Sequence, residues 1–161
     1  MPPSRANRLC IMRACRAFAF GTALAIIGYS SFARAGTASS IAVDNPWFRF
    51  LLPTLPAGGY MTLRNRTDHP AILTATHSEA CGKMMLHASV SENGQEKMVG
   101  VRSIVIPAHG NFAFRPGLYH VMCMQPNMRP GQAVAVTLEF EHLAPLTVEF
   151  RVYGATGLRA W

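Results

Sequence analysis

The chain has few acidic residues, and its first thirty-five residues have none. Across 161 residues there are 15 Lys and Arg against 8 Asp and Glu, a formal net charge of +7. Five of the basic residues are arginines within that first segment, so the rest of the chain carries 10 basic and 8 acidic residues, about +2 (10 minus 8). These charges are mixed along the sequence. A protein that binds nucleic acid needs a basic stripe or patch, so we exclude that class of partner.

Beyond this first segment, the sequence also lacks any run of eighteen apolar residues, the length that a membrane-spanning helix needs. The one long apolar run, "AFAFGTALAIIG" at 17–28, follows an arginine-rich segment and precedes the A-x-A pattern of Ala33 and Ala35. This order is typical of a secretory signal peptide, 1–35, cleaved after Ala35. No Arg-Arg pair precedes it, so we expect Sec-type export to the periplasm. We expect no stable membrane insertion of the remaining domain, 36–161.

Cysteine is scarce once this leader is set aside. Cys10 and Cys15 precede the apolar run, so neither is placed as a lipoprotein cysteine. Cys81 and Cys123 remain, an even number in an oxidising compartment. A disulfide between them is the default interpretation, and two free thiols that bind copper are the rival one.

From residue 36 onward the sequence lacks the 3.6-residue apolar period of helices, and it has no internal repeat. Short β-rich runs alternate instead with turn signals such as "SENG" and "RPG", at a spacing of roughly 8–12 residues. This pattern predicts an antiparallel β-sandwich or small barrel. The segment 46–59, with three prolines, is predicted to be an ordered loop. Strands are expected at 40–44, 59–65, 71–77, 83–90, 96–101, 111–116, 119–124, 133–140 and 146–152.

Histidine, methionine and cysteine gather in "YHVMCM", residues 119–124. In an extended strand, residues two apart point to the same face. His120, Met122 and Met124 therefore share one face of this strand, and Cys123 points to the other. The cysteine is thus the member of the group that is turned away from the histidine.

Two further strands place a soft donor on the face away from their apolar residues. In "KMMLHASV", Met85 and His87 lie opposite the apolar set, and in "QEKMVGV", Met98 lies opposite Val99 and Val101, which we expect to face the core. Imidazole and thioether together favour Cu(I), because thioether is a poor ligand for Zn²⁺, Mg²⁺ and Ca²⁺. Methionine also fills apolar cores. The residues alone therefore leave a copper site and ordinary packing both open.

The spacing of these residues resembles a known copper motif. His87, Met98, His120 and Met122 form the pattern H-x10-M-x21-H-x-M, within the surrounding text "GGYMTLRN", "MMLHASV", "IPAHG" and "GQAVAVTLEF". The pattern resembles the periplasmic copper chaperones of the PCu(A)C family, over residues 41–152. The resemblance implies a cupredoxin-like antiparallel β-sandwich or small Greek-key barrel. It also implies one Cu(I) per chain, held by these four residues.

The resemblance implies a carrier and not an enzyme. Its copper acceptor would be cytochrome c oxidase subunit II, at the copper-A centre, or another copper-accepting protein, and we expect a monomer. Met85 and Met124 share faces with the ligands, so we expect them beside the ion or at a transient entry site. Copper storage or tolerance is the alternative function for the same site.

Three other classes fit the residues less well. A blue-copper protein would need Cys123 as a thiolate with a second histidine soon after it, but no histidine follows before His142. A copper monooxygenase with an N-terminal histidine does not fit, since cleavage after Ala35 leaves Gly36. A metal-free binding module remains open. The histidines beside turn signals are expected at the surface: His69, His77, His109 and His142.

Overall fold

The computed structural model describes residues 39–155, and within them the chain forms ten β-strands and no helix. No helix of this part of the chain is therefore long and apolar enough to cross a bilayer. The expected signal peptide, 1–35, lies outside the described residues. The strands are β1 (Ile41–Arg49), β2 (Ala57–Asn65), β3 (Ala71–His77), β4 (Cys81–Glu92), β5 (Gln95–Gly100), β6 (Ile104–Ile106), β7 (Asn111–Phe114), β8 (Tyr119–Pro126), β9 (Ala133–Phe140) and β10 (Leu146–Tyr153).

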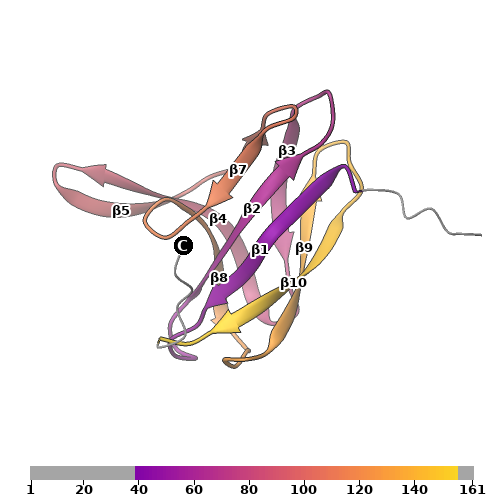
Figure 1. Ribbon diagram of the computed structural model, residues 1–161. Helices are drawn as coiled ribbons and strands as arrows, with labels where there is room; N and C mark the ends of the chain where they lie inside the picture. The colour runs from indigo at the N-terminus through magenta and orange to yellow at the C-terminus, as the bar shows by residue number, and fades with distance from the viewer. Residues whose placement is uncertain (1–38, 156–161) are drawn as a thin grey trace, which may run out of the picture. The chain divides into compact units, whose positions relative to one another are not determined.

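All ten strands belong to one hydrogen-bonded sheet, ordered β5-β4-β8-β2-β1-β10-β9-β3-β6, with β7 paired to β2. The sheet folds back on itself, so that β1 and β2 lie in front of β3 and β9 in Figure 1 and β3 contacts β4. The predicted all-β, sandwich-like fold is confirmed. One pairing differs from the antiparallel expectation, because β1 and β10 run parallel.

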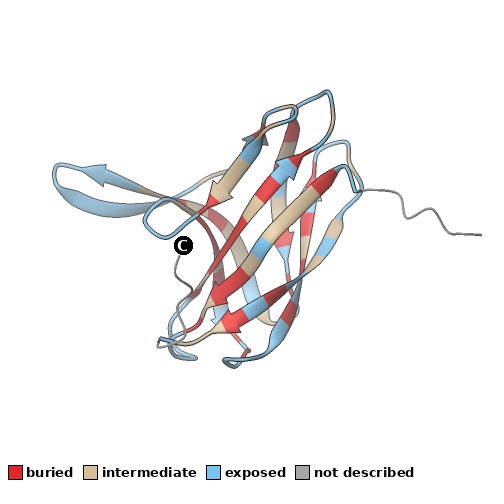
Figure 2. Cartoon of the chain, in the orientation of Figure 1, coloured by how far each residue is buried: buried red, intermediate tan, exposed pale blue. Residues whose placement is uncertain are grey.

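The core lies between the two layers of this folded sheet. Phe48 of β1 and Phe150 of β10 are fully buried, with ring centroids 5.0 Å apart, and Leu63, Val121 and Leu138 are buried around them. Figure 2 shows buried and exposed residues alternating along these strands. Each such side chain contributes roughly 1.5–3 kcal/mol by leaving water. The alternation places one face of β9 and of β10 in this core.

The prediction of a loop over 46–59 is wrong at both ends. Strand β1 continues to Arg49 and β2 begins at Ala57. The register between β1 and β2 shifts between Asp44 and Trp47, and Asn45 has a φ of 48°. Pro46 lies within this bulge, where no ladder hydrogen bond is required from its nitrogen. Strand β1 therefore accommodates Pro46 because the pairing of β1 with β2 is irregular at this point. Strand β6 was also missed, since "IPAHG" reads as a turn.

The β4–β5 hairpin projects beyond the body of the sandwich (Figure 1). Its turn places Asn93 and Gly94 at positive φ between the paired residues Glu92 and Gln95, a two-residue turn typical of tight hairpins. All of β5 is exposed, as Figure 2 shows. The expectation that Val99 faces the core is therefore wrong. The hairpin projects beyond the sandwich, so no second layer of the sheet covers β5.

Candidate metal centre

Strands β4 and β8 bring three of the four predicted ligands onto one face. His87 is paired directly with His120, and Met85 with Met122. Side chains of directly paired residues in neighbouring strands point to the same side of a sheet. The rings of His87 and His120 meet edge to face, with centroids 5.8 Å apart. The predicted convergence of these two histidines is observed.

Met98 reaches the same face from the projecting hairpin. It pairs with Ser89, two residues along β4 from His87. Met98 is 65% exposed, which makes it the most accessible of the four predicted ligands. A hollow of about 490 Å³ beside β8, hereafter the β8 hollow, is lined by Met98, His120 and Met122 together. His87 instead lines a neighbouring hollow of about 280 Å³ with Met85.

The two histidines each present a buried nitrogen without a hydrogen-bond partner, Nδ1 of His87 and Nε2 of His120. Nδ1 of His120 lies 3.3 Å from the carbonyl oxygen of Leu118. A carbonyl only accepts, so Nδ1 carries the proton and donates it, which leaves a lone pair on Nε2. Buried polar atoms are nearly always satisfied. Nδ1 of His87 and Nε2 of His120 are two such exceptions, on rings that lie side by side.

Burial lowers the pKa of His120 below its usual value, the hydrogen bond to Leu118 opposes this shift, and the nearby His87 lowers the pKa further. The ring is therefore kept neutral, which is the form that binds metal.

The donor set is soft and uncharged. Two imidazoles and two thioethers stand at the predicted positions, and none of the residues that line the β8 hollow is acidic. Within residues 39–155, no group of three His, Cys, Asp or Glu gathers as a hard-metal or zinc site would require. The chemistry of these donors fits Cu(I).

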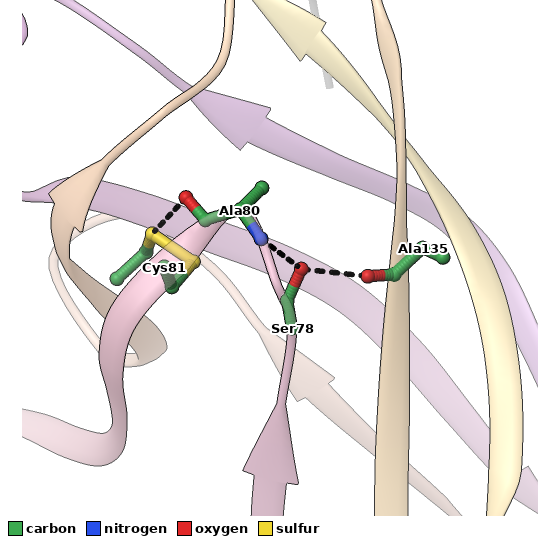
Figure 3. The surroundings of a disulfide bond; sticks show 5 residues. Ser78, Ala80, Cys81 and Ala135 are labelled. Carbon is green, nitrogen blue, oxygen red and sulfur yellow. Dashed lines mark hydrogen bonds between the residues drawn. A yellow bond between two sulfur atoms is a disulfide. The ribbon is translucent and has the colours of Figure 1, made fainter.

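Cys81 and Cys123 form a disulfide, with an S–S distance of 2.05 Å and Cα atoms 5.4 Å apart. The bond ties β4 to β8 from the core side, where Cys123 is fully buried. Figure 3 shows it beside Ser78, whose hydroxyl donates to the carbonyl of Ala135 at 2.7 Å. The predicted disulfide is confirmed. Because its sulfur is bonded, Cys123 has no thiolate to offer, and the blue-copper interpretation loses its central ligand.

Arg49, Gly58 and Tyr60 are among the residues of the β8 hollow that escaped the sequence analysis. Gly58 pairs with Arg49 on one side and with Met122 on the other. A Cβ atom at Gly58 would lie 2.7 Å from the Tyr60 hydroxyl oxygen, so the glycine makes room for the phenol of Tyr60. Glycine inside a predicted strand often marks close approach. The "GGY" stretch therefore held a signal for this site.

Tyr60 forms an aromatic wall of the hollow. Its ring lies 4.7 Å from that of Trp47 and 6.4 Å from that of His120. Both aromatic residues are buried. His120 is therefore held between a packed aromatic pair and the ring of His87.

The structure also shows the surroundings of the other residues named in the sequence analysis, two methionines and four histidines. Met85 is half-buried opposite Met122, and Met124 is half-buried opposite Lys83. The four other histidines are exposed, as expected, and three of them lie beside carboxylates: His77 at Glu79, His109 at Asp68 and His142 at Glu141.

Solved structures with the same fold include copper proteins. The copper-bound PCuAC domain from PmoF2 matches with a TM-score of 0.61 and 25% identity, over 72% of this chain and 94% of that domain. The solution structure of apo-DR1885 from Deinococcus radiodurans matches with a TM-score of 0.57 and 23% identity, over 97% and 99% of the two chains. Its CuI form matches with a TM-score of 0.53 and 24% identity, over 79% and 85%. The DR1885 matches support the fold alone.

Sequence comparison gives a family. A curated relative, "Putative lipoprotein Lxx21020" of Leifsonia xyli subsp. xyli (strain CTCB07), is 31% identical over 111 residues. The match spans 64% of this chain and 63% of the relative. A family model described as "Putative lipoprotein LpqE-like" matches residues 41–152, from the first strand to the last. The chain therefore belongs to the LpqE-like family and has the fold of PCuAC domains.

Proposed function

We propose that this protein is an exported copper chaperone that binds one Cu(I) through His87, Met98, His120 and Met122. The observation that carries the proposal is the pair of buried, unpartnered imidazole nitrogens on a face shared with two thioethers. The copper-bound PCuAC domain with the same fold supports it. Neutral imidazole and thioether hold Cu(I) without free thiols, which an oxidising compartment would convert to disulfides.

The exposure of Met98 suggests how the ion is handed over. This thioether stands on the projecting hairpin, while His120 is buried. An acceptor's ligand would reach the ion from the hairpin side and replace Met98 first, so copper passes between proteins without being released to water. The buried histidine then leaves last.

We place this activity in the periplasm, with cytochrome c oxidase subunit II as the acceptor. The leader pattern over 1–35 supports export, and the family description, which names a lipoprotein, supports an envelope location. N-terminal sequencing of the exported protein is expected to begin at Gly36. A chain that retains its leader would contradict release into the periplasm.

Copper binding is tested by anaerobic titration of Cu(I) against a competing chromophoric chelator. The wild type is expected to take up one Cu(I) per chain, and His120→Ala to lose most of its affinity. His109→Ala is the matched control, since His109 is exposed beside Asp68 in the β6–β7 connection and lines neither of the two hollows. A wild-type protein that does not compete with the chelator for Cu(I) would contradict the proposal.

The acceptor is tested by mixing the Cu(I)-loaded protein with a soluble copper-A domain. We expect copper to appear in that domain, as read by its visible absorption after oxidation. If copper stays bound to this protein while binding itself is tight, storage or tolerance becomes its function.

A further inference from the structure

Arg49 stands in the β8 hollow beside the proposed copper ligands. It is the last residue of β1 and pairs with Gly58, which in turn pairs with Met122. Paired residues share a face of the sheet. Gly58 has no side chain, and the phenol of Tyr60, two residues further along β2, lies over it. Arg49, Tyr60, His120 and Met122 line one hollow together.

Among residues 39–155, Arg49 has no ion-pair partner, and one of its guanidinium nitrogens has no hydrogen-bond acceptor. Its Nε is buried and makes no hydrogen bond. Among residues 39–155, its guanidinium forms no salt bridge, since the ion pairs of this region involve other residues. A donor left unsatisfied away from water costs free energy, and a charged one costs more. Arg49 is thus a half-buried cation without an anionic partner among the described residues.

The charge of Arg49 acts within the hollow. Burial raises the pKa of Tyr60, and the neighbouring Arg49 opposes that shift. Bound Cu(I) would add a second positive charge. This charge would not be neutralised, because the four proposed ligands are neutral and none of the residues that line the hollow is acidic. Two cations in one hollow without an anion favour an incoming negative group.

We propose that Arg49 is an anion-binding residue of the β8 hollow, which receives a carboxylate of the molecule that exchanges copper with the site. The inference rests on the proposed function. Arginine suits this role because its planar fork binds a carboxylate through two parallel hydrogen bonds. Exposed Leu51 and Leu55 flank the hollow. They give the partner apolar contacts around the charged one.

The test compares two copper acceptors that differ in charge. Cu(I) is transferred by stopped flow from the loaded protein to bicinchoninate, which carries two carboxylates, and to its uncharged dimethyl ester. The wild type is compared with Arg49→Gln and Arg49→Lys. The control is Arg129→Gln, because Arg129 is exposed in the β8–β9 connection and does not line the hollow. Thermal unfolding and Cu(I) titration verify that each variant is folded and loaded.

We expect Arg49→Gln to slow transfer to bicinchoninate about tenfold, the scale of one charge-assisted hydrogen bond. Transfer to the ester should be unchanged, Arg49→Lys should be intermediate, and Arg129→Gln should match the wild type. In the wild type, added salt should slow transfer to bicinchoninate and should leave transfer to the ester unchanged. This comparison requires no variant.

Equal slowing toward both acceptors would overturn the inference, since Arg49 would then act through the structure of the site. No slowing toward either acceptor would also overturn it, while leaving the copper site intact. A wild type that holds no Cu(I) would remove the proposed function, and this inference with it.

Discussion

Gly58, paired with Met122, makes room for the Tyr60 phenol in the β8 hollow. A methyl group there would press on the Tyr60 hydroxyl oxygen at 2.7 Å, and the Tyr60 ring is already packed on Trp47. We expect Gly58→Ala to lower the free energy of unfolding by about 1–3 kcal/mol, as overpacking does, and to weaken Cu(I) binding.

Gly100→Ala is the control, since no heavy atom lies within 4 Å of the added carbon. Chemical denaturation and Cu(I) titration measure both effects. Equal losses in the two variants would contradict the steric argument.

His120 makes the stability of the copper-free protein depend on pH. Its pKa in the folded state lies below the ordinary value of 6.5, chiefly because of burial. The unfolded chain therefore takes up a proton at higher pH than the folded one. The stability due to the neutral ring is complete above about pH 6.5 and is lost as pH falls toward the folded-state pKa.

This loss is measured by urea unfolding at pH 7.5 and pH 5. We expect the free energy of unfolding to fall more in the wild type than in His120→Gln between these two pH values. In an NMR titration, the midpoint for the His120 ring signals should lie below pH 6.5. An NMR midpoint above 6.5 would refute the prediction.

At the residue scale, the sequence predicted the side chains that share a face within one strand. His120 and Met122 are two positions apart, so strand alternation alone aligned them. Arg49 and Gly58 were missed for a physical reason. Their place beside Met122 depends on the register of β1, β2 and β8, which are joined by pairing across long stretches of sequence.

Among the elements, the β4–β5 hairpin is the part that copper should order. Strand β5 pairs with β4 alone and is exposed throughout. Exposed hydrogen bonds with few packed neighbours open easily. We expect β5 amides to exchange quickly in the copper-free protein and to become protected on Cu(I) binding, as read by hydrogen–deuterium exchange.

Met98→Leu is the matched variant for this experiment, since it keeps the apolar side chain and removes the sulfur. Protection of β5 should disappear in Met98→Leu. If it persists, Met98 does not link the hairpin to the ion.

The disulfide links the same β4 strand to β8, from the opposite face. It joins residues 42 apart in sequence, so the loop it closes in the unfolded chain corresponds to a stabilisation of about 2–4 kcal/mol. The double variant Cys81→Ala and Cys123→Ala should lose that much in urea unfolding. Its Cu(I) affinity should stay within a few fold of the wild type, because the sulfurs are on the core side. A complete loss of copper binding by the folded variant would show that a cysteine is a ligand.

Element boundaries were the weaker part of the sequence analysis. Alternating runs such as 133–140 were placed correctly, because one buried face imposes a clear period of two. The bulge that admits Pro46 into β1 was invisible, since its cost is offset by pairing with β2 and β10 elsewhere along the strand. Short β6 was missed because three residues carry too little pattern.

For the whole molecule, the sandwich-like fold followed from strand-length runs and turn signals, but its closure did not. The parallel pairing of β1 with β10 joins Trp47 to Arg151, residues from opposite ends of the described chain. No local pattern encodes such a contact. It is set by burial of Phe48 against Phe150 once both strands exist.

Copper binding to the folded state should stabilise the whole domain. A ligand at about one hundred times its dissociation constant adds about 2.7 kcal/mol when it does not bind the unfolded chain. For a domain of this size, that gain raises the melting temperature by on the order of 10 °C. We expect this shift for Cu(I) in differential scanning fluorimetry without oxygen, and a much smaller shift for Zn²⁺, because thioethers are poor zinc ligands.

His120→Ala should show no shift with either metal. Equal shifts with Cu(I) and Zn²⁺ would mean that the metal is held by exposed histidines, such as His77 and His142. The four residues on the shared face would then not be the site. The difference between the shifts with the two metals, measured on the intact protein, therefore decides whether His87, Met98, His120 and Met122 form a soft-metal site.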